Sequence, residues 1–475
     1  MTTKYEKANQ KIKLNKTQRG ILVDALQEEP NVYLQQIQFE IDTLYDKKTF
    51  ETALSLILMK HTTLVSSIEL VDNDFYFVPV FNINDILTTN EDSYESFQAN
   101  QYNRTKKGFD LFTDSLFRVD LTLNNGFSYF SITFHQILLD GTSINNLINE
   151  LFYAYASLLK NPEFKLKPEK ITASEVAVIM ESKPEKIEYV KEEPLFNNSQ
   201  LSNIKTSTKI IYDQLELAEI ESFCKSHRIT LNSFIFTLYL YFIGRSIDNN
   251  VFTAGFAVDG RNPEIEGVYE TLGCLIQTLL FETEELDFKS EVKPEIFSKV
   301  NSKLLNIISD CYEYNLNQTV IDFENSHLDS MYSFHNYEFN ELAKNVVFKE
   351  LNTTDILPYV INFTVIPTNN QLEMFLTYDS NIKGEDLIAN IVDEARSIYI
   401  KESNEDSSVI EILEEILGES NISINQSIFE LGVNSLSLAI LYKKLKNKNV
   451  DLNFLDLIKA KTVKDIISLI KKKKR

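Results

Sequence analysis

Alternating polar and apolar positions divide most of the chain into the strands and helices of an α/β body. Residues 33–43 alternate as in a strand with one buried face, and residues 127–134 form an apolar run typical of a buried strand. Apolar residues recur at helical spacing over 47–61 and 143–159. The second half repeats this order, with a helix followed by strands predicted at 230–246, 251–258, 329–335, 359–366 and 371–377. The pattern predicts two α/β lobes, joined by the polar segment 160–200.

The C-terminal residues have a different, purely helical pattern. Apolar positions predict an amphipathic helix over 408–418, a helix from Ser435 to about Lys446, and a short helix, a turn and a last helix over 454–470. The charged sequence ESNEDSS before them predicts a linker. We therefore divide the chain into an N-lobe, a C-lobe, a linker, a helical domain and a basic tail, at residues 12–165, 166–400, 401–407, 408–470 and 471–475.

Composition narrows the class of protein and its surroundings. A chain of 475 residues, 43% of them hydrophobic, is long enough for more than one folded unit. Its net charge of −22 argues against a nucleic-acid partner. Its three cysteines lie far apart and fit neither a metal site nor a disulfide framework, which favours a reducing compartment. No apolar run has membrane length, so we expect no membrane partner. The cysteine pattern adds the expectation of a cytoplasmic protein without a metal site.

The C-terminal helical pattern contains a candidate attachment site. Gly432, Asn434, Ser435 and Leu436 place a serine at a predicted helix start, where free N–H groups and the helix dipole favour a phosphate. The simpler interpretation of residues 431–436 alone is an ordinary serine N-cap. Over 408–470, however, the order and spacing of the helices resemble the acyl- and peptidyl-carrier family. That resemblance implies an all-α four-helix carrier with 4′-phosphopantetheine bound covalently to Ser435.

A second motif lies between the apolar strand at 127–134 and the helix at 143–159. Residues 134–141 read FHQILLDG and resemble the His-His-x-x-x-Asp-Gly motif of nonribosomal peptide synthetase condensation domains. Further segments follow in that family's order, at 14–22, 60–68, 227–240, 252–261, 272–281 and 328–337. The resemblance covers about residues 12–400. It implies two chloramphenicol-acetyltransferase-like lobes arranged as a V-shaped pseudo-dimer.

The motif departs from the family at the residue credited with handling the amine. Gln136 stands in place of the second histidine, and an amide cannot take up a proton near neutral pH. By the resemblance, His135 is a buried structural residue, Asp140 is mainly structural and precedes Gly141 of the motif, and Arg261 is the salt-bridge partner of Asp140. These residues form the candidate catalytic site.

Two further observations leave the chemistry open. His335 lies in a segment that the family places near the channel between the lobes, so it is a candidate substitute base. A half-buried strand histidine without a chemical role is the favoured interpretation. In the 60–68 segment the family's arginines are replaced by Lys60 and Val65.

The resemblance implies a condensation–carrier didomain that joins a carrier-bound acyl or peptidyl thioester to a nucleophile as an amide or ester. The implied partners are an upstream carrier as donor, an adenylation enzyme acting in trans and a phosphopantetheinyl transferase. Gln136 keeps two alternatives open. One is a catalytically silent scaffold that presents a loaded carrier to tailoring enzymes, and the other is an acyltransferase to a free small-molecule amine or alcohol.

Overall fold

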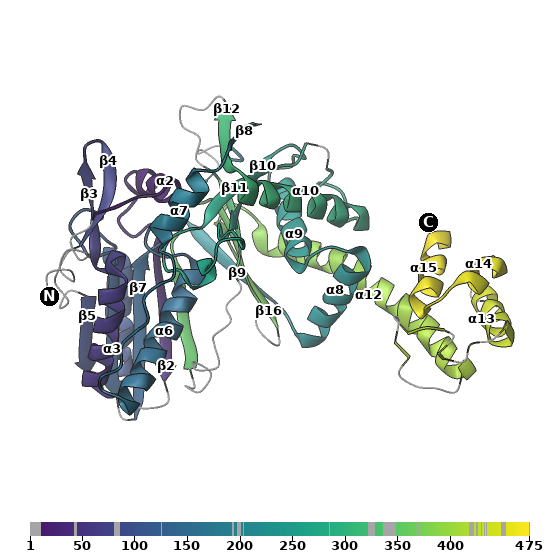
Figure 1. The fold of residues 1–475 in the computed structure, drawn as a ribbon. Coiled ribbons are helices and arrows are strands. Elements are labelled where there is room, and N and C mark those ends of the chain that lie inside the picture. Colours follow the sequence, from purple (N-terminus) through teal and green to yellow (C-terminus); the bar gives the residue numbers. More distant parts are fainter. Residues whose placement is uncertain are drawn as a thin grey trace.

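The computed structural model contains two sheet-based lobes followed by a helical domain (Figure 1). It describes residues 11–41, 45–79, 86–124, 126–191, 194–196, 201–202, 204–284, 286–321, 328–335, 348–367, 371–417, 422–423, 426–428, 430–431, 433, 435–447 and 453–474. The predicted α/β class and the helical C-terminus are both confirmed. No helix among the described residues is long and apolar enough to cross a membrane.

The N-lobe is built on a five-stranded sheet in which only β5 and β6 pair in parallel. In spatial order its strands are β14 (Phe348–Asp355), β2 (Leu34–Ile41), β7 (Phe127–His135), β6 (Phe117–Asn124) and β5 (Leu87–Glu91). The lobe also contains helices α2 (Lys16–Ala25), α3 (Lys47–Lys60), α5 (Tyr94–Lys107) and α6 (Gly141–Lys160), with a small sheet of β1 (Ile12–Lys13), β4 (Asp74–Pro79) and β3 (Ser66–Val71). Apolar faces of β7, α3 and α6 share one core, which explains their strand and helix periodicities.

The C-lobe is built on a six-stranded sheet covered by helices. Its strand order is β11 (Gln277–Glu282), β10 (Thr253–Val258), β13 (Ser330–Phe334), β15 (Ile361–Pro367), β16 (Leu372–Asp379) and β9 (Lys205–Tyr212). The helices in its core are α8 (Gln214–His227), α9 (Leu231–Ser246), α10 (Pro294–Glu313) and the first part of α12 (Gly384–Leu417). The polar segment 160–200 contains α7 (Ala173–Glu181) and β8 (Glu185–Lys191), which pairs in parallel with β12 (Asn315–Ile321).

The boundary between the lobes differs from the one predicted. Strand β14 belongs to the C-terminal half of the chain, yet it pairs antiparallel with β2 along the edge of the N-lobe sheet. Residues 348–355 therefore complete the N-lobe, although the sequence assigned them to the C-lobe. A local pattern cannot reveal this, because it carries no information on which distant strand is the partner.

The predicted linker at 401–407 lies inside α12, so the connection between the C-lobe and the C-terminal domain is helical. This helix runs without interruption from the C-lobe into the C-terminal domain, where it is followed by α13 (Ser435–Asn447), α14 (Phe454–Lys459) and α15 (Val463–Lys474). The tail predicted at 471–475 likewise begins within α15. Packing at the two ends of α12, around Ile391 and around Leu413, anchors the helix on both sides of its polar middle.

His61 forms a buried charged cluster at the end of α3. Its ring Nε2 lies 2.7 Å from Glu150 Oε2, its Nδ1 lies 3.2 Å from Glu169 Oε1, and Lys60 also contacts Glu150. Burial alone would lower the pKa of His61, but the two carboxylates raise it above the ordinary value of 6.5. The cluster therefore favours the protonated imidazole in the folded state.

The stability of the N-lobe is expected to fall as the pH rises above 6.5 toward the raised pKa of folded His61. In this range the unfolded chain releases a proton that folded His61 retains, so the unfolded state binds fewer protons and gains relative stability. The slope reaches at most about 1.4 kcal/mol per pH unit. Urea unfolding at several pH values should show this slope in the wild type and a flatter profile for His61→Gln. Equal slopes would contradict the role assigned to His61.

Candidate active site

The motif segment connects the end of β7 to the start of α6, and its buried residues fix the geometry of the turn. Asp140 is the N-cap of α6, and its Oδ1 accepts the Ser143 N–H at 2.9 Å. Gly141 is the first residue of the helix. We call residues 134–141 together with Arg261 the motif junction.

His135 has the structural environment that the sequence predicted. Its side chain is buried, its Nδ1 accepts the Ile137 N–H at 3.2 Å, and the other ring nitrogen bonds the backbone of Val32. Burial lowers the pKa of His135 to about 3. With both nitrogens engaged and no tendency to take up a proton at neutral pH, His135 holds the turn in place.

Gln136 is half-buried, and its side chain ends in an unused acceptor. Its backbone N–H donates to the Tyr33 carbonyl at 2.8 Å, which fixes the residue against the start of β2. Its buried Oε1 has no hydrogen-bond partner within the described residues. A buried acceptor without a partner costs free energy, so Oε1 is available to accept a hydrogen bond from a molecule that reaches it.

The predicted pairing of Asp140 with Arg261 is confirmed. Arg261 Nη1 and Nη2 donate to the two oxygens of Asp140 at 2.8 and 3.0 Å, and both side chains are buried. Burial alone would raise the pKa of Asp140, but Arg261 and the Leu275 and Ser143 amides lower it overall. Arg261 also contacts Asp259, whose pKa is raised because burial outweighs that contact. The bidentate pair connects the start of α6 to the C-lobe across 121 residues of sequence.

Gly260 permits this connection. It has a φ of +42°, and an added Cβ would lie 1.9 Å from the Leu275 carbonyl oxygen. Only glycine allows the backbone to approach this closely before Arg261 turns into the junction.

His335 lies near the junction but has the properties of a weak base. It follows β13, its N–H donates to the Val365 carbonyl at 2.8 Å, and its Nε2 is 3.1 Å from Ser333 Oγ. Burial lowers its pKa to about 4, against an opposing effect of Asp140 that reflects their proximity. A histidine with this pKa is neutral at pH 7 and has a small driving force for taking up a proton.

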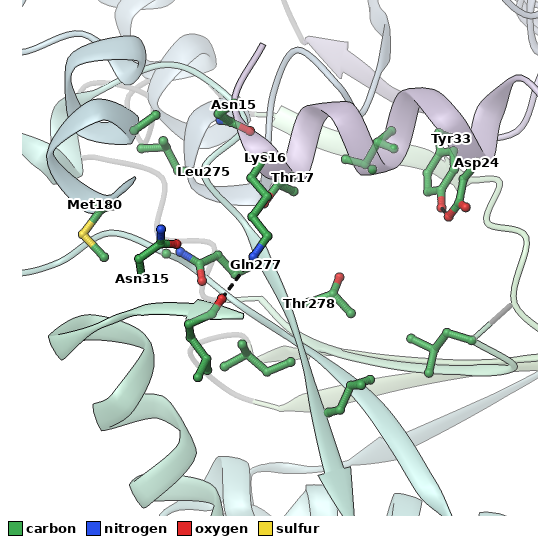
Figure 2. Close-up of a pocket in the computed structure, with 18 of the residues that line it drawn as sticks. Asn15, Lys16, Thr17, Asp24, Tyr33, Met180, Leu275, Gln277, Thr278 and Asn315 are labelled. Atoms are coloured by element: carbon green, nitrogen blue, oxygen red, sulfur yellow. Dashed lines mark hydrogen bonds between the residues drawn. The ribbon is translucent and has the colours of Figure 1, made fainter. Parts of the chain in front are cut away.

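A cavity of about 500 Å³ adjoins the motif junction between the lobes. One wall comes from α2 and Tyr33, and the other from the C-lobe segments near Leu275 and Leu316 (Figure 2). Tyr33 accepts the Gln136 N–H, the Leu275 N–H donates to Asp140 at 2.8 Å, and Gly260 precedes Arg261. The cavity and the junction are thus connected through three lining residues, while the junction residues themselves are not among those that line it.

The cavity contains polar residues that sequence reasoning missed. Lys16, Asp24 and Tyr33 line it, and none belongs to the motif. By sequence, the segment 14–22 matches the first of the family's segments, and Tyr33 begins the alternating pattern of a strand. The left-handed φ of Tyr33, +63°, had no signal in the sequence, because that conformation is usually occupied by glycine or asparagine.

The C-terminal domain places Ser435 at the predicted position, the first residue of α13. Leu436 follows it in the helix, while Gly432 and Asn434 lie outside the described residues. Leu413 of α12, Leu441 of α13 and Ile466 of α15 pack into one core. The structure brings His135, Gln136, Asp140, Gly141 and Arg261 together, with His335 nearby, whereas Ser435 belongs to the domain at the far end of α12 (Figure 1).

Comparison with protein families accounts for both parts of this arrangement. Residues 8–398 match the model described as Condensation domain. The chain belongs to the condensation-domain family. Residues 407–470 match the model described as Phosphopantetheine attachment site, so the C-terminal domain is a carrier for a covalent 4′-phosphopantetheine.

Curated relatives of this condensation–carrier chain are synthetases. It is 25% identical to bacitracin synthase 3 of Bacillus licheniformis over 450 residues, which are 86% of the chain and 7% of that protein. It is 22% identical to gramicidin S synthase 2 of Brevibacillus brevis over 438 residues, 85% of the chain and 10% of that protein. The chain therefore spans a tenth or less of the length of these synthetases.

Solved structures share the condensation fold at low sequence identity. The epimerization domain from the third module of tyrocidine synthetase B has a TM-score of 0.64 at 13% identity, covering 83% of this chain and 97% of that one. The condensation domain of monacolin K polyketide synthase has a TM-score of 0.63 at 12% identity, covering 82% and 96%. These similarities establish the two-lobed fold of residues before the carrier.

Proposed function

We propose that this condensation–carrier didomain joins a carrier-bound acyl or peptidyl thioester to a nucleophile during nonribosomal peptide synthesis. The observation that carries the proposal is the interlobe cavity, which is lined by Tyr33 and Leu275, the residues that hydrogen-bond Gln136 and Asp140. The arm on Ser435 supplies a thiol that holds the carried group as a thioester. The donor is a second, upstream carrier. An adenylation enzyme in trans and a phosphopantetheinyl transferase prepare the carrier of this chain.

The proposed chemistry depends on positioning. Asp140 and Arg261 are paired through both carboxylate oxygens, and His135 is buried and neutral, so these residues hold the junction rather than exchange protons. Gln136 carries the unpartnered Oε1, which can accept a hydrogen bond from an attacking amine or hydroxyl. Placement of two reactants can itself supply a large part of a rate enhancement. The proposed activity is therefore slow and independent of a histidine base.

Ser435 is the proposed attachment site, and its position fits a phosphate ester. The free N–H groups and positive dipole end of α13 lie at this residue. The continuous α12 keeps the carrier on the same chain as the junction, which favours its use as acceptor through a high local concentration.

The second candidate is a scaffold that displays a loaded carrier without forming bonds. Gln136 favours it, because general acid–base help is typically worth roughly 100- to 10,000-fold and an amide cannot act as a base. The two candidates differ in whether the protein accelerates transfer above the uncatalysed rate.

Transfer between two loaded carriers, followed by intact-protein mass spectrometry, is expected to show slow activity that depends on Gln136. Gln136→Ala should reduce the rate roughly tenfold or more by removing the orienting group. Gln136→His should raise it, and His335→Ala should change it little. Gln27→Ala, which alters an exposed glutamine outside the cavity, is the matched control.

Rates equal to the background without enzyme in every variant, with genuine partners supplied, would end the enzyme proposal in favour of the scaffold. Product formation with a free amine or alcohol and no second carrier would instead identify a small-molecule acyltransferase.

A further inference from the structure

Residues 161–172, here called the crossing segment, lead from the N-lobe to the C-lobe and carry an ion pair at the point of crossing. Leu166 packs against the N-lobe core, whereas Ile171 packs into a small cluster with residues of the C-lobe. Between them, Glu169 reaches back to the N-lobe, where its Oε1 lies 3.2 Å from His61 Nδ1. This contact therefore ties the segment to the N-lobe just before it joins the C-lobe.

Both ring nitrogens of His61 face carboxylates. Nε2 lies 2.7 Å from Glu150 Oε2, Nδ1 faces Glu169, and the His61 side chain is only 2% exposed. A neutral imidazole has a single N–H, so one of the two carboxylates would then face a lone pair. The arrangement requires the charged ring. Burial lowers the pKa of His61, but the two carboxylates outweigh it and raise the pKa above 6.5.

The two carboxylates are not held equally. Glu150 also contacts Lys60, so it keeps a cation when His61 loses its proton. Glu169 forms no other ion pair within the described part of the chain, and its Oε1 has no hydrogen-bond partner there. The contact between Glu169 and His61 therefore depends on the charge of the ring, and it is the one that deprotonation breaks.

Other cations nearby are already engaged. Lys13 lines the same small cavity of about 110 Å³ as His61 and Glu169, but it is paired with Asp74 at 2.6 Å. Lys170 is exposed and pairs with a C-lobe carboxylate at 3.6 Å. Loss of the His61 proton thus leaves the Glu169 side chain, 15% exposed, without a cation. An uncompensated carboxylate in such a place gains free energy by moving into water.

We propose that His61 and Glu169 form a proton-dependent clasp, which holds the crossing segment on the N-lobe while His61 is charged and releases it when His61 is neutral. The segment leads directly into α7, whose Ala177, Met180 and Glu181 line the interlobe cavity. Release therefore frees the connection between the N-lobe and one wall of this cavity. The inference goes beyond the proposed function, because it concerns how the lobes are held and does not require transfer to occur.

Tryptic cleavage of the full-length chain after Lys170 measures release of the segment, because this exposed lysine directly follows Glu169. The ratio of the Glu169→Gln rate to the wild-type rate at the same pH cancels the pH dependence of trypsin. Rates on synthetic peptides of the two sequences correct for the changed residue. The variant should be cleaved roughly tenfold faster at pH 6, as expected for loss of one contact between charged groups. The ratio should fall toward one by pH 9, as wild-type His61 loses its proton.

Further variants assign the effect to the clasp. His61→Gln is uncharged at every pH and should be cleaved fast throughout, whereas Glu163→Gln, an equal charge change on an exposed residue of the same segment, should follow the wild type. Cleavage after Lys48 of α3 is the internal reference for unfolding of the N-lobe. A ratio that is constant from pH 6 to 9, equal cleavage of Glu169→Gln and wild type at pH 6, or a parallel rise at Lys48 would overturn the proposal.

Discussion

Replacing Ser435 with alanine is expected to abolish attachment of the 4′-phosphopantetheine arm. The serine hydroxyl is the group that would form the phosphate ester, and alanine has no atom that can replace it. Ser435 begins α13, where helix N–H groups and the dipole favour the incoming phosphate. Incubation with coenzyme A and a broad-specificity phosphopantetheinyl transferase should add one arm to the wild type and none to Ser435→Ala, measured by intact-protein mass spectrometry.

Ser437→Ala is the matched control, because this serine lies two residues further along the same helix. It should accept one arm as the wild type does. An arm on the Ser435→Ala protein would place the attachment site elsewhere. An unmodified wild type would argue against carrier activity in this domain.

Breaking the Asp140–Arg261 pair is expected to destabilise the condensation body by about 3–5 kcal/mol, because either change leaves buried charge without its partner. Arg261→Met should cost more than Asp140→Asn. It strands the carboxylates of both Asp140 and Asp259, whereas Asp140→Asn leaves the arginine in contact with Asp259. Urea unfolding of each single variant and of the double variant measures the coupling between the two side chains.

An exposed pair with a similar distance provides the control. Lys11 Nζ lies 3.0 Å from Glu69 Oε2, with side-chain exposures of 42% and 51%, so its coupling should be about 0–1 kcal/mol. The buried pair should show a much larger coupling, and all variants should still accept the phosphopantetheine arm. Additive effects at Asp140 and Arg261 would mean that the interaction between them contributes little to stability.

The sequence predicted those elements whose periodicity directly reflects packing. The strand at 127–134 and the helices at 47–61 and 230–246 correspond to β7, α3 and α9, because their apolar faces enter the lobe cores. The same reasoning did not reveal that the linker at 401–407 is helical. A polar stretch has no apolar face to reveal a helix, and here the helix is held by packing at Ile391 and Leu413 on either side.

Site residues that belong to a family motif could be predicted from the sequence. Site properties that depend on long-range contacts could not be predicted. Asp140 and Arg261 could be paired through family resemblance, although 121 residues separate them. The unpartnered oxygen of Gln136 and the left-handed backbone of Tyr33 depend on neighbours from distant strands. No local propensity could identify them. The attachment of the arm to Ser435 and the catalytic roles of the junction residues stay predictions.

Strand β14 makes the folding of the N-lobe depend on residues that are synthesised after most of the C-lobe. As the chain leaves the ribosome, residues 12–165 emerge first, yet the strand that covers β2 follows only after nearly two hundred further residues. Until then β2 is an open edge, a template onto which another nascent chain can add. The N-lobe sheet therefore cannot be completed during translation before β14 is synthesised. Dividing the chain between the lobes would remove the edge strand β14 from the N-lobe sheet.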